Sequence, residues 1–497
     1  MELFSCEILE NKLHRLLQPC LPEKMCEHAK NRRTFNKMRQ LLLITCFLLA
    51  MMQVFARDAI VTMTTTNDSV NIYVEWTGVG SLTANGVELR AENVNTISTA
   101  ADGSVALMAT GDAQLTILWC GFEYETIDDT KWPMLTEYSN NNLTALNIIN
   151  CPELTMLECS YNSLTHLDVT NCPKLKSLGC DGNSLTTLDV TKYPELTKLW
   201  CSLNPLYFLD VNNCAELTEL YCDYNSLSDL DVTNCPALEV LSCRYNSLSA
   251  LNVGKCPKLT WLECSNNKHL RALDITNCIL LGSLYCSENS LTTLDVTKCP
   301  LLTTLWCDNN SLSALDVSNC LKLTKWECSN NSLTNLDIKN CADLTLISCN
   351  NTSLTTLDIS NCRKLTYIDC GNNSLTVLDV ANCRELEHLY CYNNSLTTLD
   401  VSTCPKLNFI KAHKQTPVLP AATAKGTKLR IKNPIKFAGA KVNIDNISHS
   451  GIYKAGNIIW NIQGKSGEVT FNFITELPDD VTGESFSGTA TQPWTKK

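Results

Sequence analysis

A repeat of 21 residues runs through most of this 497-residue chain and restricts the folds open to it. One unit, Leu154 to Lys174, has the sequence LTMLECSYNSLTHLDVTNCPK, and the sixth unit is one residue longer, near Asn267-Lys268-His269. A period of this length is typical of a solenoid, in which each unit buries its apolar side against its neighbours. Twelve successive units begin at Leu154, Leu175, Leu196, Leu217, Leu238, Leu259, Leu281, Leu302, Leu323, Leu344, Leu365 and Leu386.

Each unit has two arms, LxxLxCxxNxL and LxxLDVxxCPxL. Equivalent side chains of stacked strands lie about 4.8 Å apart, so the Leu, Val and Cys positions predict continuous buried columns. An inward Asn, such as Asn183, can donate to and accept from the turn backbone, and Thr352 interrupts this Asn column. A thirteenth unit starts at Leu407 and loses the pattern at Ala412, and a degenerate leading unit lies around Leu115–Cys120.

On these motifs, the chain resembles the leucine-rich repeat family over residues 115–412. The 21-residue length and the Cys at the third apolar position of the strand resemble the cysteine-ladder subtype of the internalins. The resemblance implies a mostly β solenoid of about 12–13 repeats, with a parallel β-sheet on its concave face. It implies a binding protein but does not identify the ligand.

The repeats are flanked by two further regions. Residues 57–114 are polar, rich in Thr and Val, and alternate in places, which predicts an N-terminal β cap over the first repeat. Residues 413–497 are predicted as a separate C-terminal β-sandwich-like domain, which follows a linker at Thr416–Pro420. Short strand patterns occur in it at Lys441–Ile444, Ile458–Ile462 and Val469–Phe473.

The N-terminus has the order of segments that is typical of a secretory signal. Basic residues precede the apolar run Leu41–Met52, and small residues then precede Arg57. We therefore expect a signal peptide at 38–56, with 1–37 as a doubtful upstream extension. The apolar run is shorter than the roughly 20 residues of a spanning helix, so the mature chain is expected to lack a transmembrane span. A single-pass anchor is the alternative.

The cysteines follow the repeat. Four of the 29 precede the predicted cut, and the other 25 form two columns, one in each arm, with Tyr193 in the one vacant place. Their spacing, without CxxC pairs or regular His, argues against zinc. Disulfides are the alternative in an exported protein, but strand spacing is wider than the Cβ separation of about 3.8 Å that a bridge needs. We expect buried thiols that act as small apolar fillers.

An Asp column precedes the second-arm Val or Ile, as at Asp168 and Asp189. Stacked carboxylates could hold calcium through oxygen ligands. We expect instead that they point outward and accept hydrogen bonds from turn N–H groups, so no metal site and no cofactor are predicted.

Composition and motifs exclude other functions. The net charge of −11 argues against a nucleic-acid binder, because such a protein needs more Lys and Arg than Asp and Glu to neutralise the phosphates. The seven His are scattered, and GxSxG, HExxH and phosphate-loop motifs do not occur. The chain is therefore expected not to be an enzyme, and no catalytic residue is predicted.

Residues between the buried Leu and Cys positions are expected to point outward on the concave face, where aromatic side chains collect among acidic ones. Exposed aromatics with an Arg among acids are typical of interaction hot spots. A chance scatter of β-favouring residues on strands is the alternative explanation. The predicted ligand-binding residues are Trp200, Tyr221, Tyr224, Tyr245, Trp261, Tyr285, Trp306, Glu219, Arg244 and Glu263.

These observations favour a secreted or cell-surface bacterial binding protein, expected to be a monomer, that recognises a protein partner through its concave aromatic-acidic face. Two alternatives stay open. One is a glycan-binding surface protein in which sugar rings stack on Trp200, Tyr285 and Trp306. The other is a structural surface component without a specific ligand.

If the export signal is genuine, the mature protein recovered from its native host should begin near Arg57. Edman sequencing or terminal peptide mass mapping checks this. Detection of an intact terminus at Met1 or Met38 would contradict the secreted assignment.

Overall fold

The computed structural model of the protein describes residues 59–65, 67, 69–77, 81–90, 94–109, 114–120, 141–424, 428–433, 436–437, 442–448, 451–454, 457–461, 466–475, 482–485 and 487–496. The chain forms two compact units, Met1–Ala59 and Ile60–Lys497, and nearly all described residues belong to the second. The predicted extension 1–37 and signal peptide 38–56 lie outside these residues. The elements of secondary structure in the described residues are all β-strands. These residues therefore contain no helix that could cross a membrane.

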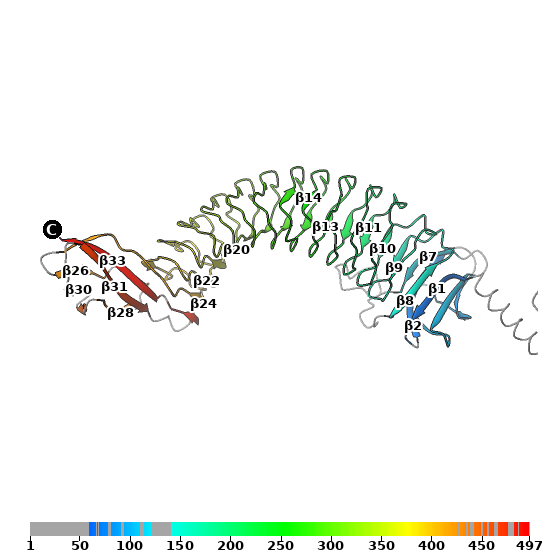
Figure 1. The fold of residues 1–497 in the computed structure, drawn as a ribbon, viewed down its shortest axis with the longest axis horizontal. Helices are drawn as coiled ribbons and strands as arrows, with labels where there is room; N and C mark the ends of the chain where they lie inside the picture. Colours follow the sequence, from blue (N-terminus) through cyan, green and yellow to red (C-terminus); the bar gives the residue numbers. More distant parts are fainter. Residues whose placement is uncertain are drawn as a thin grey trace, which may run out of the picture. The chain divides into compact units, whose positions relative to one another are not determined.

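The predicted solenoid is present as a stack of short parallel strands (Figure 1). Each strand pairs with the next in register, so that Leu178 of β10 lies between Leu157 of β9 and Leu199 of β11. The sheet lines the inner side of the curved array (Figure 1), as predicted. Its strands are β9 (Met156–Glu158), β10 (Ser177–Gly179), β11 (Lys198–Trp200), β12 (Glu219–Tyr221), β13 (Val240–Ser242), β15 (Trp261–Glu263), β17 (Ser283–Tyr285), β18 (Thr304–Trp306), β19 (Lys325–Glu327), β20 (Leu346–Ser348), β21 (Tyr367–Asp369), β22 (His388–Tyr390) and β24 (Phe409–Lys411).

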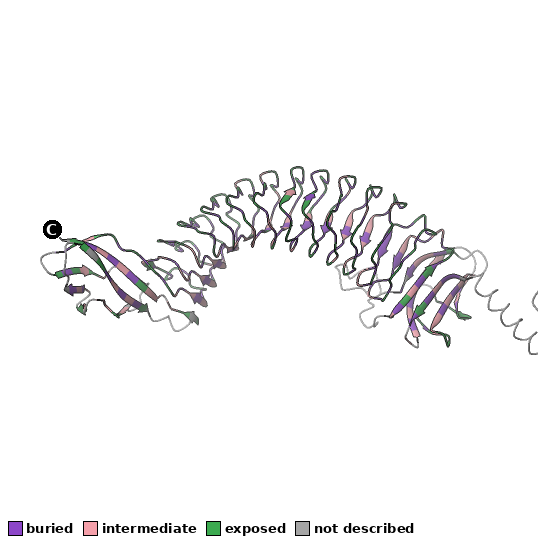
Figure 2. Cartoon of the chain, in the orientation of Figure 1, coloured by how far each residue is buried: buried purple, intermediate pink, exposed green. Residues whose placement is uncertain are grey.

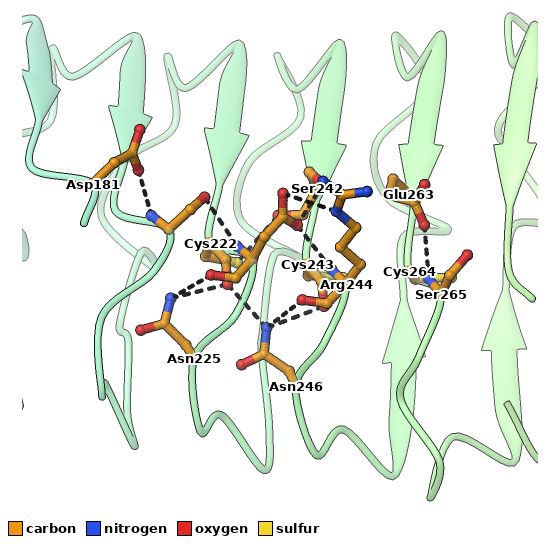
Figure 3. Close-up of polar contacts among 12 residues, drawn as sticks. Asp181, Cys222, Asn225, Ser242, Cys243, Arg244, Asn246, Glu263, Cys264 and Ser265 are labelled. Atoms are coloured by element: carbon orange, nitrogen blue, oxygen red, sulfur yellow. Dashed lines mark hydrogen bonds and ion pairs between the residues drawn. The ribbon is translucent and has the colours of Figure 1, made fainter. Parts of the chain in front are cut away.

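The Asn column closes the turn that follows each strand. The side-chain amide nitrogen of Asn246 donates to the carbonyl oxygens of Cys222 (2.9 Å) and Cys243 (3.1 Å) (Figure 3). Its carbonyl oxygen accepts the N–H of Leu227 (3.0 Å). One side chain therefore satisfies backbone groups of two units that would otherwise be buried without partners. This confirms the predicted role. Gln415 continues the column after the Cys pattern stops, with its amide on Cys391 and Ala412.

All 25 cysteines in the described residues are buried and carry free thiols. Ladder cysteines pack in columns, and some direct their sulfur at a neighbouring carbonyl, as Cys159 does toward Gly179 (3.3 Å). Burial raises the pKa of these thiols, to about 12 at Cys235 and about 11 at Cys214. The structure confirms the prediction of buried thiols rather than disulfides, and Tyr193 fills the vacant place as a buried side chain.

The Asp column points outward and stabilises turns, as expected. The carboxylate of Asp168 accepts the N–H of Thr170 (2.9 Å), and that of Asp231 accepts the N–H of Thr233 (2.9 Å). This is the local turn that Asp and Asn side chains form with the residue two positions ahead. These carboxylates therefore already have a structural role within each repeat.

A further column, which the sequence patterns did not reveal, follows the first-arm cysteines. The hydroxyl of Ser160 accepts the N–H of Asp181 (3.0 Å), and the hydroxyl of Ser202 accepts the N–H of Asp223 (3.1 Å). The carboxylate of Asp181 in turn accepts the N–H of Ser202, and that of Asp223 accepts the N–H of Arg244 (2.9 Å). Alternating hydroxyl and carboxylate side chains thus connect neighbouring units where each strand ends.

The N-terminal cap consists of two layers of antiparallel strands. One sheet has the order β4-β3-β6-β1-β8, while β2 pairs with β5 and β7. Strand β7 then pairs in parallel with β9, so the cap continues directly into the solenoid sheet. The predicted boundary between 114 and 115 falls inside β7. The cap strands are β1 (Ala59–Thr65), β2 (Ser69–Thr77), β3 (Leu82–Ala84), β4 (Val87–Glu88), β5 (Val94–Ser98), β6 (Ser104–Ala109), β7 (Gln114–Trp119) and β8 (Leu143–Ile148).

The C-terminal region forms two small sheets, with orders β25-β33-β31-β28 and β26-β30-β29. Strand β32 pairs in parallel with β24. The predicted linker packs against the C-terminal region, because Leu419 is buried and its N–H donates to the carbonyl oxygen of Thr491 (2.8 Å). These contacts join the region to the last repeat. Its strands are β25 (Ala422–Ala424), β26 (Lys428–Lys432), β28 (Val442–Asp445), β29 (Ile452–Lys454), β30 (Asn457–Asn461), β31 (Ser466–Thr475), β32 (Thr482–Glu484) and β33 (Ser487–Lys496).

Two pairs of minor strands lie outside the main sheet of the solenoid. Strand β14 (Ala250–Asn252) pairs with β16 (Ala272–Asp274) on the second arms of neighbouring repeats. Strand β23 (Thr398–Leu399) pairs with β27 (Lys436–Phe437), which gives the C-terminal region a second backbone connection to the last full repeat.

The thiol columns predict a sharp difference in alkylation between folded and unfolded protein. Native protein should resist iodoacetamide, because the thiols are buried and protonated, whereas denatured protein should be labelled at the 25 ladder cysteines without prior reduction. Intact mass spectrometry counts the labels. A denatured, unreduced sample that stays unlabelled would contradict the free-thiol assignment.

Two Asp side chains should give opposite pH dependences. Burial raises the folded-state pKa of Asp223 above its ordinary 3.8, so the free energy of unfolding of wild type falls as pH rises through the raised pKa. Asp223→Asn lacks this loss, so its stability should increase relative to that of wild type as pH rises. The hydrogen bond from Thr233 lowers the pKa of Asp231, so its contribution is lost as pH falls through the lowered pKa. The stability of Asp231→Asn should therefore decrease relative to that of wild type as pH rises.

Urea unfolding of both variants and wild type between about pH 3 and pH 7 measures these differences in the free energy of unfolding. Parallel slopes for the two variants would contradict the assignment of a buried role to Asp223 and an exposed turn role to Asp231.

Candidate binding site

The three-residue strands present two outward positions each, on either side of a buried central residue. In β12, Leu220 is fully buried while Glu219 and Tyr221 are partly exposed. The central residue is buried in every strand of this sheet, whereas the flanking positions vary from buried, as in β10, to partly exposed (Figure 2). Successive side chains of a strand point to opposite faces, which explains the alternation. The inner face therefore carries two parallel outward columns, and parallel pairing in register fixes the spacing of their side chains.

An aromatic row occupies the middle of this face and consists of Tyr221, Trp261, Tyr285 and Trp306. Ring centroids are 6.3 Å apart for Tyr221 and Trp261, 5.8 Å for Trp261 and Tyr285, and 5.0 Å for Tyr285 and Trp306. Tilted and edge-to-face pairs at these separations are favourable aromatic contacts. Trp261 lies in the other outward column and bridges the gap that Ser242 and Glu263 leave between Tyr221 and Tyr285, so the row is continuous.

Trp200 extends the aromatic row at its N-terminal end. It pairs in register with Tyr221, and the ammonium of Lys198 lies 5.7 Å from the centre of its ring. Lys198 also forms an ion pair with Glu219 across neighbouring strands (2.8 Å). Because both charged side chains are partly exposed, this ion pair contributes little to stability.

A second group of predicted residues lies where the strands end. The rings of Tyr224 and Tyr245 are stacked, with centroids 4.2 Å apart, and the Arg244 guanidinium lies 5.5 Å from the centre of the Tyr224 ring. Arg244 also lies 3.7 Å from the Asp223 carboxylate, which accepts the hydroxyl of Ser242 (Figure 3). The Asp223 carboxylate thus positions the Arg244 cation above a tyrosine pair.

Glu263 differs from the expectation of an open carboxylate. It is only 9% exposed, and its carboxylate accepts the N–H of Ser265 (2.9 Å) (Figure 3). Burial raises its pKa. Glu263 therefore has a structural contact within its own turn.

A C-terminal aromatic cluster was not among the predicted site residues. It consists of Tyr367, His388, Tyr390 and Phe409, with ring centroids 5.2–6.2 Å apart. The ammonium of Lys411 lies 5.8 Å from the Phe409 ring. The sequence signal was present, because these residues flank buried positions one period apart, but Phe409 belongs to the thirteenth unit, where the Cys pattern stops.

The described residues contain no group of three or more His, Cys, Asp and Glu side chains that could hold a metal ion. A nucleophilic cysteine requires a lowered pKa, and burial raises the pKa of all the thiols in this part of the chain. The inner face itself presents aromatic rings and a few charged side chains.

Comparison with known proteins identifies similar chains. The solved structure of the functional domain of InlJ from Listeria monocytogenes, described as including a cysteine ladder, is 30% identical with a TM-score of 0.54. The match covers 71% of this chain and 89% of that one. An internalin, inlF, from L. monocytogenes strain 4b F2365 is 20% identical over 52% of this chain and 86% of its own, with a TM-score of 0.47.

Two further matches concern parts of the chain. Residues 439–495 match the family model "LRR adjacent". Internalin I of Listeria monocytogenes serotype 4b (strain F2365) is 38% identical over 87 residues, which is 17% of this chain and 5% of that protein, so the match spans a small part of the relative's length. From the InlJ match and the 21-residue cysteine repeats, the chain belongs to the leucine-rich repeat proteins of the cysteine-ladder internalin type.

Proposed function

We propose that this chain is an exported bacterial recognition protein that binds a protein partner through the inner face of its sheet. The observation that carries the proposal is the continuous aromatic row of Tyr221, Trp261, Tyr285 and Trp306. Large aromatic side chains are enriched at the centres of protein interfaces, where they lose contact with water at low cost in conformational entropy.

Rigidity of the supporting sheet favours the same role. Each aromatic side chain stands on a strand whose central residue is buried, and Asn and Cys columns fix each strand to the next. A site on a rigid sheet loses little conformational freedom when it binds, so more of the contact energy appears as affinity. The proposed role is binding without catalysis, and export rests on the predicted signal at 38–56.

A protein partner is preferred over a glycan because of how the rings are arranged. Tyr285 meets Trp306 edge to face at 85°, and Trp261 is tilted by 52° to Tyr285. A sugar ring stacks best on a flat exposed ring, whereas a row of rings at different angles forms an irregular apolar surface suited to protein side chains. Arrays of proteins and of glycans, probed with the full chain, separate these two classes.

Replacing Trp200 and Trp306 by Ala should weaken partner binding by more than about tenfold. Each anchoring aromatic typically contributes about 2 kcal/mol, and each tenfold change is about 1.4 kcal/mol. Stability should change little, because these side chains point away from the core. Titration calorimetry with the partner selected on the array measures binding, and thermal melting measures stability.

Two control variants complete this experiment. Leu220→Ala should lower stability by about 2–5 kcal/mol through a core cavity, while Phe208→Ala, an exposed aromatic outside the inner face, should change neither property. The proposal fails if the double Trp variant binds normally, or if it melts as early as Leu220→Ala.

A further inference from the structure

One position in every repeat has a left-handed backbone, two residues after the first-arm cysteine. Its φ lies between 50° and 60° throughout the array, which means that the turn itself imposes this conformation. Gly and Asn adopt it readily, whereas other side chains clash with the backbone there. The column consists of Tyr161, Gly182, Leu203, Tyr224, Tyr245, Asn266, Glu288, Asn309, Asn330, Asn351, Asn372, Asn393 and Lys414.

The two halves of this column differ in kind. From Asn266 onward the position is mostly Asn, the residue that suits the backbone. In the first five repeats it holds Tyr three times and Leu once, which are poor choices for a left-handed backbone. Burial does not compensate, because Leu203, Tyr224 and Tyr245 are each more than 40% exposed. Strain that packing does not offset points to a function for the side chains.

These bulky residues occupy one column along the strand ends. The Tyr161 ring extends over Gly182, where a ring carbon lies 2.6 Å from the position that a Cβ would occupy. Leu203 follows, and Tyr224 and Tyr245 are stacked with centroids 4.2 Å apart. Gly182 thus leaves room for its neighbour's ring. We name Tyr161, Leu203, Tyr224 and Tyr245 the edge ridge.

The charges beside the edge ridge indicate its partner. On the strands and strand ends of these five repeats, the acids outnumber the bases four to two, which leaves a net charge of −2. Glu219 pairs with Lys198 and Asp223 with Arg244, so the excess negative charge is that of the buried Glu158 and the half-buried Asp181. The exposed tyrosine faces also attract cations. The Arg244 guanidinium lies 5.5 Å from the centre of the Tyr224 ring, so this ring already has a cation contact of the kind that a Lys or Arg of a partner would make.

We propose that the edge ridge is a second contact line that binds a segment of the protein partner in which Lys or Arg stands next to apolar side chains. This inference rests on the proposed function, since it extends the binding surface from the sheet onto its edge. The ridge selects among partners by charge and shape, while the aromatic row of the sheet supplies the larger apolar contact.

The test uses a random twelve-residue peptide library displayed on phage, selected on the full chain. Peptides that bind should be enriched in Lys or Arg beside aromatic or aliphatic residues. The double variant Tyr224→Asn, Tyr245→Asn should bind the selected peptides at least about tenfold more weakly. Its melting temperature should equal or exceed that of wild type, because Asn suits the left-handed backbone.

Glu288→Asn is the matched control, because it introduces Asn at the same left-handed position of a repeat outside the edge ridge. It should leave peptide binding unchanged and should not lower the melting temperature. Normal binding by the double Tyr variant, a lower melting temperature for it, or selected peptides without an excess of Lys and Arg would each overturn the inference. If binding is lost only on replacement of Trp200 and Trp306, the ridge fails and the proposed function stands. If neither pair of changes affects binding, both fail.

Discussion

The hydrogen bonds of one asparagine side chain per repeat hold this solenoid together. A turn that follows a three-residue strand exposes carbonyl and N–H groups that neither the strand nor water can satisfy once the next repeat is stacked on it. The amide of Asn183 reaches Cys159 and Cys180, while its oxygen accepts the N–H of Leu164, so a single side chain connects two turns. Small cysteines fit beside it without displacing the Leu column.

This constraint on the inside of the repeat leaves the outward positions of the strands free to vary. Every strand keeps its buried centre, whether Leu220, Ile347 or Trp326 occupies it, whereas the flanking residues include Gly, Ser, Trp and Glu. The aromatic row and the C-terminal aromatic cluster therefore arise on a scaffold whose stability does not depend on them. Recognition surfaces are easily placed on such a fold, because changes there do not disturb the columns.

The strict period made much of the fold predictable from sequence. Parallel pairing in register follows directly from a 21-residue repeat, so the buried columns, the outward Asp turns and the cysteine packing were all predicted, and Thr352 interrupts the Asn column where expected. The alternating Ser and Asp column was missed because the residues in it share no single chemical type. Gln415 was missed because its longer side chain replaces Asn only at the end of the array.

The candidate site was predictable only in part. Alternation along a strand identifies which residues point outward, and so Tyr285 and Trp306 were found. It does not show that the Glu263 carboxylate turns back to accept the N–H of Ser265. It also does not show that Trp261, from the other outward column, completes the row. The left-handed position, where Tyr224 lies, depends on a backbone angle that no hydrophobic pattern encodes.

The extra residue of the sixth repeat lies between Asn267 and Leu270, outside the sheet. Asn267 keeps its bonds to Cys243 and Cys264, its own N–H donates to Asn289, and β15 still pairs with β17 in register. The added residue therefore lengthens only the loop outside the sheet, and the register of the strands on the inner face is unchanged. An array built in this way can gain or lose residues on its outer side, or accept an inserted loop there, while the spacing of its recognition residues remains constant.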